Sequence, residues 1–316
     1  MNSVTYLPEG LALSIKTESE VCEETEISTT EYSVLILFYE TLLDDLSKEY
    51  SVTPNNISDS IKNIVQSYRN VKRGQLQKYI DYNDIRNCLG YLHRYATCHT
   101  ALVWVTLTNV FNSCLSSVLT SELSKNNLNV MFLGGGPGND FFGFLNALYG
   151  KHESLINLYV TVVDRMTGWN DVFLKTVEKL KLGDYGPASK IFEDVCVIPS
   201  FIDFDLKMPV GLNYSLKMKL QSANIVFLVK FLSHISDNDK LIVVKNIVEY
   251  MGTGAILIFI DCPYLSSVFS AVSELKLVYH ADEKQFIFNS TKNRFGYAVN
   301  NKCRASTYIF TKLATF

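Results

Sequence analysis

The sequence predicts an α/β fold with five parallel strands, a C-terminal antiparallel hairpin and a helical N-terminal extension. Three observations predict this fold. From residue 126 onward, short apolar runs alternate with amphipathic stretches, as in the βαβ units of a parallel sheet. Over residues 31–125, apolar positions recur at helical spacing. The first apolar run after residue 126 leads directly into a glycine-rich turn and a helix, an arrangement that suits ligand binding.

The composition is that of a folded protein with no overall preference for nucleic acid. The chain has 316 residues, of which 47% are hydrophobic, enough to bury a core. With 29 Lys and Arg against 32 Asp and Glu, only a local basic patch would favour nucleic acid. The seven cysteines show no zinc-binding or disulfide spacing, and no secretory signal is recognised, so we expect an intracellular protein with reduced thiols and no metal.

The N-terminal part divides into two segments. Residues 1–30 contain six Glu and one Lys, which predicts a mobile acidic tail that is dispensable for folding. Residues 31–125 form the predicted helical region, with helical patterns over 31–46, 57–70 and 83–123. The uncharged stretch 98–121 is too rich in Ser, Thr and Asn for a membrane span, so we expect a buried helix there and no membrane association.

Residues 126–316 are predicted to form the sheet domain. Two apolar runs at its C-terminal end, 275–288 and 304–312, predict a hairpin at the edge of the sheet. A capping-box pattern at 236–239 predicts the start of the helix before the last parallel strand. The five parallel strands are predicted at Asn129–Leu133, Tyr159–Val163, Ser200–Phe204, Ile225–Val229 and Ala255–Ile260.

The glycine turn after the first strand carries the strongest chemical signal. Glycines allow the backbone to approach a ligand closely, and the helix that follows offers free N–H groups. A dinucleotide-binding turn would need a third glycine where this chain has Asn139, which disfavours NAD. The turn contains Gly134, Gly135, Gly136 and Gly138.

This turn, together with the order of the strands, resembles the class I S-adenosylmethionine-dependent methyltransferases, which have a Rossmann-like seven-stranded sheet. The resemblance implies S-adenosylmethionine as cofactor, with the glycines facing its methionine and ribose parts. The family commonly has an acid two positions before the first glycine, where this chain has Phe132. Asp140 is a candidate to replace that acid, and it could equally be a simple charge at a helix N-terminus.

Two further acids follow the next two strands. Asp164 ends the second strand, where nucleotide-binding α/β folds place a carboxylate that accepts hydrogen bonds from both ribose hydroxyls. Arg165 follows it and is a candidate to flank the adenine. The resemblance implies that Asp205, after the third strand, meets the adenine amino group. Either acid could instead be a solvent-facing residue at the rim of the sheet.

The ends of the fourth and fifth strands should border the methyl acceptor. Lys230 and His234 follow the fourth strand, and we expect Lys230 near the cofactor and His234 as a candidate base. Asp261 ends the fifth strand and is a second candidate base. The alternatives are that His234 packs or caps and that Asp261 bonds the local backbone. The Asn/Asp-Pro-Pro-Tyr pattern of adenine and glutamine methyltransferases is absent from the sequence, which disfavours those acceptors.

Residues 130–266 also resemble a fungal-type rRNA uridine-N3 methyltransferase family. The likeness rests on the glycine turn, on Asp164 followed by Trp169 and Val172, and on the acid and proline at the end of strand five. This chain has Cys262-Pro263-Tyr264 where that family has Ser-Pro-Gly. The resemblance implies uridine N3 of rRNA as the acceptor.

Residues 61–94 form a basic segment that is rich in tyrosine, with seven Lys and Arg against two Asp. Cations bind phosphate and aromatic rings stack on bases, so this segment is the best candidate for RNA contact. The alternative is a solvated helical face whose tyrosines pack on the sheet domain. Its tyrosines, with the next one along the chain, are Tyr68, Tyr79, Tyr82, Tyr91 and Tyr95.

Together these patterns predict a methyltransferase that uses S-adenosylmethionine, with RNA as the first candidate acceptor. A protein or a small molecule is the alternative acceptor, because the overall charge is negative. A non-catalytic module that binds the cofactor is the other alternative, since the motif I acid is missing and no catalytic tetrad is recognised.

Overall fold

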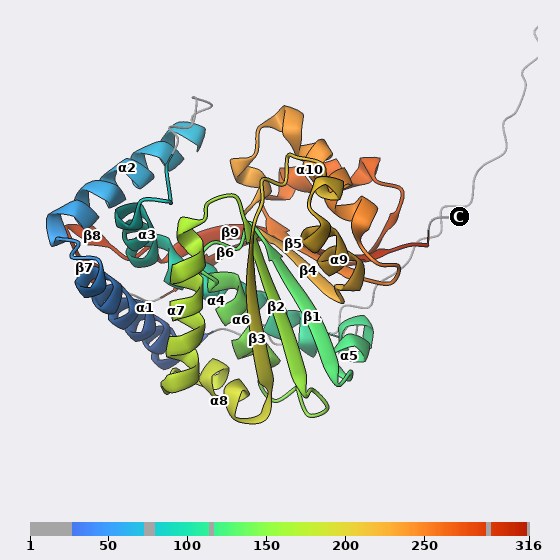
Figure 1. Cartoon of the computed structure of the whole chain (residues 1–316), viewed down its shortest axis with the longest axis horizontal. Coiled ribbons are helices and arrows are strands. Elements are labelled where there is room, and N and C mark those ends of the chain that lie inside the picture. The colour runs from blue at the N-terminus through green and yellow to red at the C-terminus, as the bar shows by residue number, and fades with distance from the viewer. Residues whose placement is uncertain (1–26, 73–79, 114–116, 289–291, 315–316) are drawn as a thin grey trace, which may run out of the picture.

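A computed structural model describes residues 27–72, 80–113, 117–288 and 292–314. Its centre is a seven-stranded sheet in the order β3-β2-β1-β4-β5-β9-β6 (Figure 1). The first five strands are parallel, and β9 runs antiparallel between β5 and β6. This order confirms the predicted fold class. The strands are β1 (Asn127–Leu133), β2 (Asn157–Asp164), β3 (Cys196–Asp203), β4 (Ile225–Val229), β5 (Ile256–Asp261), β6 (Leu275–Ile287) and β9 (Lys302–Lys312).

The central strands of the sheet are buried on both faces, whereas β3 and β6 at its two edges are partly exposed. One apolar core lies between the sheet and the helices on one face, which include those of the N-terminal region, and a second core lies between the sheet and the helices on the other face. The strand order reverses between β1 and β4, and at such a point the carboxyl ends of the strands leave a crevice in which open α/β sheets bind ligands. The helices that contribute residues to this crevice are α6 (Asn139–Leu148), α7 (Gly168–Leu182), η4 (Leu232–His234) and α10 (Asp237–Tyr250). The other helices of this part of the chain are α8 (Pro187–Asp194), α9 (Tyr214–Ser222) and η5 (Pro263–Ala271).

The N-terminal helices cover the first of these faces. α4 packs against α6 so closely that a Cβ at Gly143 would lie 2.6 Å from the Thr100 carbonyl oxygen. Most residues of α4 are buried, including Thr97, Thr100 and Thr106, so the uncharged stretch forms the buried helix that we predicted. No helix in the described ranges is long and apolar enough to cross a membrane. These helices are α1 (Thr29–Glu49), α2 (Pro54–Lys72), α3 (Ile85–Tyr91), the π-helical turn η1 (Leu92–Ala96), α4 (Thr97–Asn112) and α5 (Ser117–Leu123).

Several boundaries differ from the predicted ones. α1 begins at Thr29 with Ser28 and Glu31 in a capping box, so residues 27–30 belong to the folded part. The rest of the predicted acidic tail, residues 1–26, lies outside the described residues. α2 begins at Pro54, inside the predicted turn, because a proline in the first helical turn lacks only an N–H that would have no partner there. β3 begins at Cys196, four residues earlier than expected.

The hairpin prediction is confirmed, since β6 and β9 pair as antiparallel strands and β6 lies at the edge of the sheet. The segment between them holds a small second sheet, formed by β7 (Asn293–Arg294) and β8 (Tyr297–Ala298). This small sheet contacts the helical region, because the Ala298 carbonyl accepts a hydrogen bond from Arg94 and the Tyr297 carbonyl bonds His93 Nε2 at 2.8 Å. The end of the chain therefore helps to fix the N-terminal helices.

Candidate functional site

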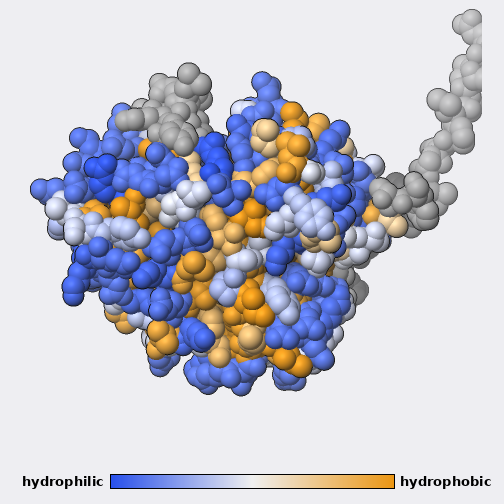
Figure 2. Space-filling model, viewed as in Figure 1, coloured by the Kyte–Doolittle hydropathy of each residue, from blue (hydrophilic) through white to orange (hydrophobic). Residues whose placement is uncertain are grey.

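A pocket of about 340 Å³ lies at the carboxyl ends of β1, β2 and β4. In the space-filling view the surface is hollowed between the lobe that carries α2 and the lobe that carries α10 (Figure 2). The pocket has one wall from the loops at the sheet edge and one from the helical region. The sheet wall includes Gly134–Gly136, Asp140, Asp164, Arg165, Asp205, Lys230 and His234, and the helical wall includes Tyr68, Ile80, Tyr82, Tyr91 and His99.

The glycine turn forms the floor of this pocket. Gly134 and Gly136 have φ angles of +69° and +49°, in the left-handed region that favours glycine. A Cβ at Gly134 would lie 2.2 Å from the ring of Phe231, and one at Gly136 would lie 3.6 Å from the indole of Trp169. The bare backbone therefore leaves room for a ligand above Gly136.

Gly138 does not line the pocket, although we predicted that it binds the cofactor. It has a φ angle of +85° and precedes the first residue of α6. A Cβ there would lie 2.7 Å from the ring of Phe173, on the packed side of the turn. Gly138 is needed for the turn and for packing, which is why the sequence alone could not separate it from the other three glycines.

Asp164 lies at the end of β2 beside the turn, as predicted. Its Oδ2 accepts a hydrogen bond from the Gly136 N–H at 3.3 Å, and its Oδ1 accepts one from the Met166 N–H at 3.1 Å. Burial raises the pKa of this carboxyl to about 6, against the lowering effect of these two N–H groups. The carboxylate is thus held in place by backbone and still faces the pocket.

Asp140 is in the first turn of α6 and is only 4% exposed. Its Oδ1 accepts a hydrogen bond from Asn139 Nδ2 at 2.7 Å. Burial raises the pKa of this carboxyl well above its usual range. A buried carboxylate without a cation is unfavourable, so the site would be stabilised by a positively charged group in the pocket.

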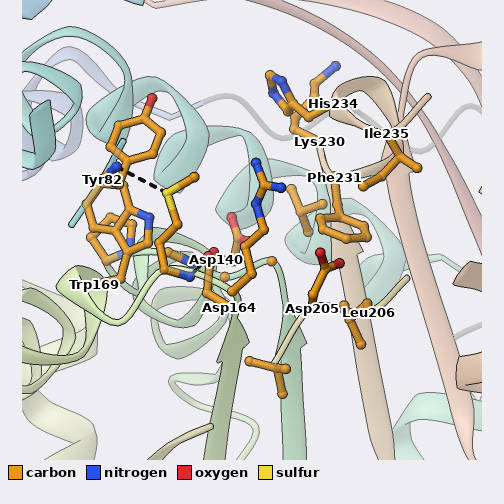
Figure 3. Close-up of a pocket in the computed structure, with 18 of the residues that line it drawn as sticks. Tyr82, Asp140, Asp164, Trp169, Asp205, Leu206, Lys230, Phe231, His234 and Ile235 are labelled. Carbon is orange, nitrogen blue, oxygen red and sulfur yellow. Dashed lines mark hydrogen bonds between the residues drawn. The ribbon is translucent and has the colours of Figure 1, made fainter. Parts of the chain in front are cut away.

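Asp205 and Arg165 also lie at the sheet wall. Asp205 is half-buried in the loop after β3, and its Oδ1 accepts a hydrogen bond from the Lys207 N–H at 3.0 Å. Figure 3 shows Asp205 and Leu206 on the opposite side of the pocket from Trp169 and Tyr82. Arg165 is exposed at the rim. Both residues therefore line the same pocket as Asp164.

Lys230 and His234 meet at the end of β4, as the pattern after that strand predicted. Lys230 has a φ angle of +49°, and its Nζ donates to the Arg304 carbonyl and lies 4.0 Å from Asp261 Oδ1. His234 is exposed, and its ring centroid is 5.0 Å from that of Tyr68 in α2. This contact joins the two lobes at the mouth of the pocket.

The second candidate base, Asp261, follows the alternative given above, in which it bonds the local backbone. It is completely buried and does not line the pocket. Its Oδ1 accepts a hydrogen bond from the Cys262 N–H at 2.8 Å, and its Oδ2 accepts one from the Ser233 N–H at 3.2 Å. Asp261 therefore ties the loops after β4 and β5 together, and it cannot reach an acceptor as a base.

The helical wall corresponds to the alternative given above for residues 61–94, in which the tyrosines pack on the sheet domain. The rings of Tyr82 and Trp169 are 4.7 Å apart, those of Tyr91 and Trp169 are 5.4 Å apart, and the Tyr68 and Tyr82 hydroxyl groups are 3.2 Å apart. These tyrosines belong to the basic segment that is our candidate for RNA contact. They turn inward, while Lys62 and Arg69 remain exposed. Tyr79 lies outside the described residues.

A sequence signal for this wall does exist. Tyr91, Tyr95 and His99 are spaced by four residues, so they lie on one face of the helical segment that runs through η1. The Tyr91 hydroxyl bonds His99 Nδ1 at 2.9 Å. Burial and the charge of Lys230 lower the pKa of His99 to about 3, so the imidazole is neutral. Short π-helical segments are frequent at functional sites.

A small set of contacts fixes the helical wall to the sheet wall. Asn83 Oδ1 accepts hydrogen bonds from Thr167 Oγ1 and from the Gly168 N–H, both at 3.0 Å. The Tyr82 N–H donates to Met166 Sδ at 3.1 Å. A Cβ at Gly168 would lie only 2.2 Å from the Tyr82 carbonyl oxygen, so this close approach requires glycine.

The described residues contain no group of three or more metal-ligating side chains. They fit a different ligand, one with a diol, a basic amine and a flat ring. Asp164 suits the diol, Asp140 the amine, and the apolar sides of the pocket near Leu206 and Phe231 suit the ring. S-adenosylmethionine has these three parts, and the glycine floor leaves the backbone approach that it needs.

No protein-family model matches the chain, and no curated protein matches it significantly. The solved structures to which it is similar include three methyltransferases. One is an O-methyltransferase family protein from Burkholderia thailandensis, with 12% identity, coverage of 74% of this chain and 61% of that one, and a TM-score of 0.44. The chain thus spans less than two thirds of the length of this structure.

The second is an S-adenosylmethionine-dependent methyltransferase from Methanosarcina mazei, with 9% identity, 63% and 98% coverage and a TM-score of 0.41. The third is the magnesium protoporphyrin IX methyltransferase of Synechocystis with bound S-adenosylmethionine, with 11% identity, 74% and 98% coverage and a TM-score of 0.39.

Proposed function

We propose that the chain is a methyltransferase that uses S-adenosylmethionine. The observation that carries the proposal is the meeting of Asp164, Asp140 and the glycine floor in one pocket at the strand-order reversal. A dinucleotide is a poorer fit, because Asn139 stands where a dinucleotide-binding turn needs its third glycine.

Each residue of the sheet wall has a defined part in this proposal. Asp164 accepts the two ribose hydroxyl groups, and Gly134–Gly136 allow the chain of the methionine part to pass over the backbone. Asp205 accepts from the adenine amino group, with Arg165 at the edge of the ring. Asp140 takes the α-ammonium group and so replaces the acid that is missing at Phe132. The Lys230 Nζ donates to the Arg304 carbonyl. Lys230 therefore contributes its backbone and the methylene groups of its side chain to the wall.

When bound, the cofactor supplies an electrophilic methyl group on a sulfonium. The residues of this chain then need only orient the acceptor and exclude water, because methyl transfer gains most of its acceleration from in-line positioning. His234 is the candidate that can take a proton, since it is exposed at the mouth where an acceptor would enter between α2 and η4.

RNA is the acceptor that we propose, with uridine N3 as the methylated atom. Two observations support it. The exposed cations Lys62 and Arg69 lie on α2, the helix that brings Tyr68 to the mouth of the pocket, and exposed cations bind phosphate. A single base could then enter beside the rings of Tyr68 and His234.

The test is transfer of a labelled methyl group from S-adenosylmethionine into cell-extract fractions. Label that is lost on nuclease treatment, and that is found in 3-methyluridine after digestion, would support the proposal. Label that survives nuclease and is lost with protease, or that is found in small molecules, would overturn the RNA acceptor but retain the methyltransferase. Cofactor binding without transfer into any fraction would indicate the non-catalytic binding module.

A further inference from the structure

Three aromatic rings stand around the space above the glycine floor. Tyr82 and Tyr91 come from the helical region and Trp169 from α7, and the three ring centroids are 4.7 to 5.9 Å from one another. The indole of Trp169 lies 3.6 Å from the position of a Cβ on Gly136, so it borders the space over the turn. Figure 3 shows Trp169 and Tyr82 together on one side of the pocket.

Two carboxyl groups flank the same space. Asp164 is joined to the turn by the Gly136 N–H, and Asp140 is two residues beyond the turn at the start of α6. Burial disfavours the ionised form of both carboxyls and so raises their pKa. A positive charge in the pocket would stabilise the ionised form of each. The faces of aromatic rings also attract cations. The rings and the carboxyl groups therefore favour the same kind of ligand.

The positive groups that line the pocket do little to oppose this preference. The Lys230 ammonium is bonded to the Arg304 carbonyl and lies near Asp261, and Lys207 Nζ lies 3.9 Å from Asp205. Arg165 is exposed at the rim, where solvent screens its attraction to the Asp164 carboxyl, and burial lowers the pKa of His234, which favours the neutral imidazole. His99 remains neutral, since its pKa is lowered to about 3.

We propose that this pocket prefers a ligand with a positive charge at one particular atom. That atom of the ligand lies between its ribose, which is bound at Asp164, and its ammonium group, which is bound at Asp140. This inference rests on the proposed function. A cofactor held by its ribose at Asp164 and by its ammonium at Asp140 has its sulfur between them, beside the three rings. The sulfonium of S-adenosylmethionine is charged there, and the thioether of the product S-adenosylhomocysteine is not. The pocket thus binds the methyl donor more tightly than the product, which favours product release.

The test is calorimetry with three ligands: S-adenosylmethionine, S-adenosylhomocysteine and sinefungin. Sinefungin carries a primary ammonium in place of the methylated sulfonium, so it separates charge from the methyl group itself. We expect the two charged ligands to bind roughly tenfold more tightly than S-adenosylhomocysteine, a difference of about 1.4 kcal/mol. Equal affinity for all three ligands, or tighter binding of S-adenosylhomocysteine, would overturn the inference.

Paired variants locate the source of the preference. Tyr82→Phe and Trp169→Phe keep a ring, and Tyr82→Leu and Trp169→Leu remove it. The preference should persist in the Phe variants and fall to about threefold or less in the Leu variants, because cation–π attraction needs the ring. Affinity for S-adenosylhomocysteine reports that the pocket is still folded in each variant. An unchanged preference in both Leu variants would contradict the role of the rings.

The outcomes also separate this inference from the function on which it rests. If none of the three ligands binds to the wild-type protein, the proposed function fails. If they bind and the charged ligands show no advantage, the cofactor assignment stands and only the charge preference fails. If only Asp140→Asn removes the preference, while the Leu variants retain it, the carboxylate and not the ring cluster would be its source, and the inference about the rings would be wrong.

Discussion

The two walls of the pocket are built in different ways. The sheet wall consists of backbone and carboxyl groups at the ends of adjacent parallel strands, and the pairing of β1 with β2 and β4 fixes them. The helical wall consists of aromatic side chains from α2, α3 and the loop before α3, and a few contacts around Asn83 and Gly168 fix its position. Strand pairing thus fixes the sheet wall, whereas the position of the helical wall depends on these docking contacts. We therefore expect changes in the sheet wall to remove binding and changes at the docking contacts to weaken it.

The largest effect is expected from Gly136→Val in the sheet wall. A valine at a φ angle of +49° is strained, and its side chain would fill the space below Trp169. Affinity for S-adenosylmethionine should fall about a hundredfold or more, equal to about 3 kcal/mol. Gly150→Val is the matched control, because Gly150 also has a positive φ angle but has no atom within 4 Å of its Cβ position. If Gly150→Val lowers the affinity for S-adenosylmethionine as much as Gly136→Val does, the strain of a valine at a positive φ angle explains the loss, and filling of the pocket does not.

A smaller effect is expected at the docking contact. In Gly168→Ala the new methyl group would overlap the Tyr82 carbonyl, so the loop that carries Tyr82 must move away. We expect affinity to fall roughly tenfold, the equivalent of about 1.4 kcal/mol, with the sheet intact by circular dichroism. Asn83→Ala removes the two hydrogen bonds without adding bulk, and it should cost less. Full affinity in Gly168→Ala would show that the helical wall does not contact the cofactor.

The pH dependence of binding should follow the sheet wall. The pKa of Asp164 is about 6, so the carboxyl is protonated below that value and loses acceptors for the ribose hydroxyls. Affinity should therefore rise with pH, and it should be about tenfold lower at pH 5 than at pH 7.5. The raised pKa of Asp140 acts in the same direction, and His99, with a pKa of about 3, does not titrate in this range. Asp164→Asn should remove most of the step, and calorimetry at several pH values measures it.

The smallest effect on binding is expected at Asp261, which lies behind both walls. Asp261→Asn leaves one of two buried N–H groups without its acceptor, so the free energy of unfolding should fall by about 1 to 3 kcal/mol. Affinity for S-adenosylmethionine should stay within about twofold, because Asp261 does not line the pocket. Denaturant unfolding and calorimetry measure the two effects. A methylation rate that collapses in a stable Asp261→Asn protein would restore Asp261 as a candidate base.

The same contrast explains how much could be predicted from the sequence. The sheet wall was predictable because its signals are local: an apolar strand ends, and a glycine or an acid follows within a few residues. Parallel strands then bring those ends to one edge, so Gly134, Asp164, Asp205 and Lys230 could be placed together without knowing any packing. Gly138 and Asp261 carry the same local signals and face away, since a strand end does not specify the direction of each side chain.

The helical wall could not be predicted in this way. The tyrosines of residues 61–94 are compatible with an outward or an inward face, and only docking onto α7 decides between them. In the sequence, the cations beside these tyrosines favoured an outward face. In the structure the cations Lys62 and Arg69 are exposed, whereas Tyr68 lines the pocket. The four-residue spacing of Tyr91, Tyr95 and His99 was the available signal for an inward face.

The most direct test of the account is calorimetric titration of the wild-type protein and of Asp164→Ala with S-adenosylmethionine, with NAD as a comparison ligand. We predict binding of one S-adenosylmethionine per chain, no binding of NAD, and an affinity at least about tenfold lower in a folded Asp164→Ala protein, because the carboxylate is the acceptor for the ribose hydroxyls. Absence of binding by the wild-type protein, or equal affinity in the folded variant, would contradict the account.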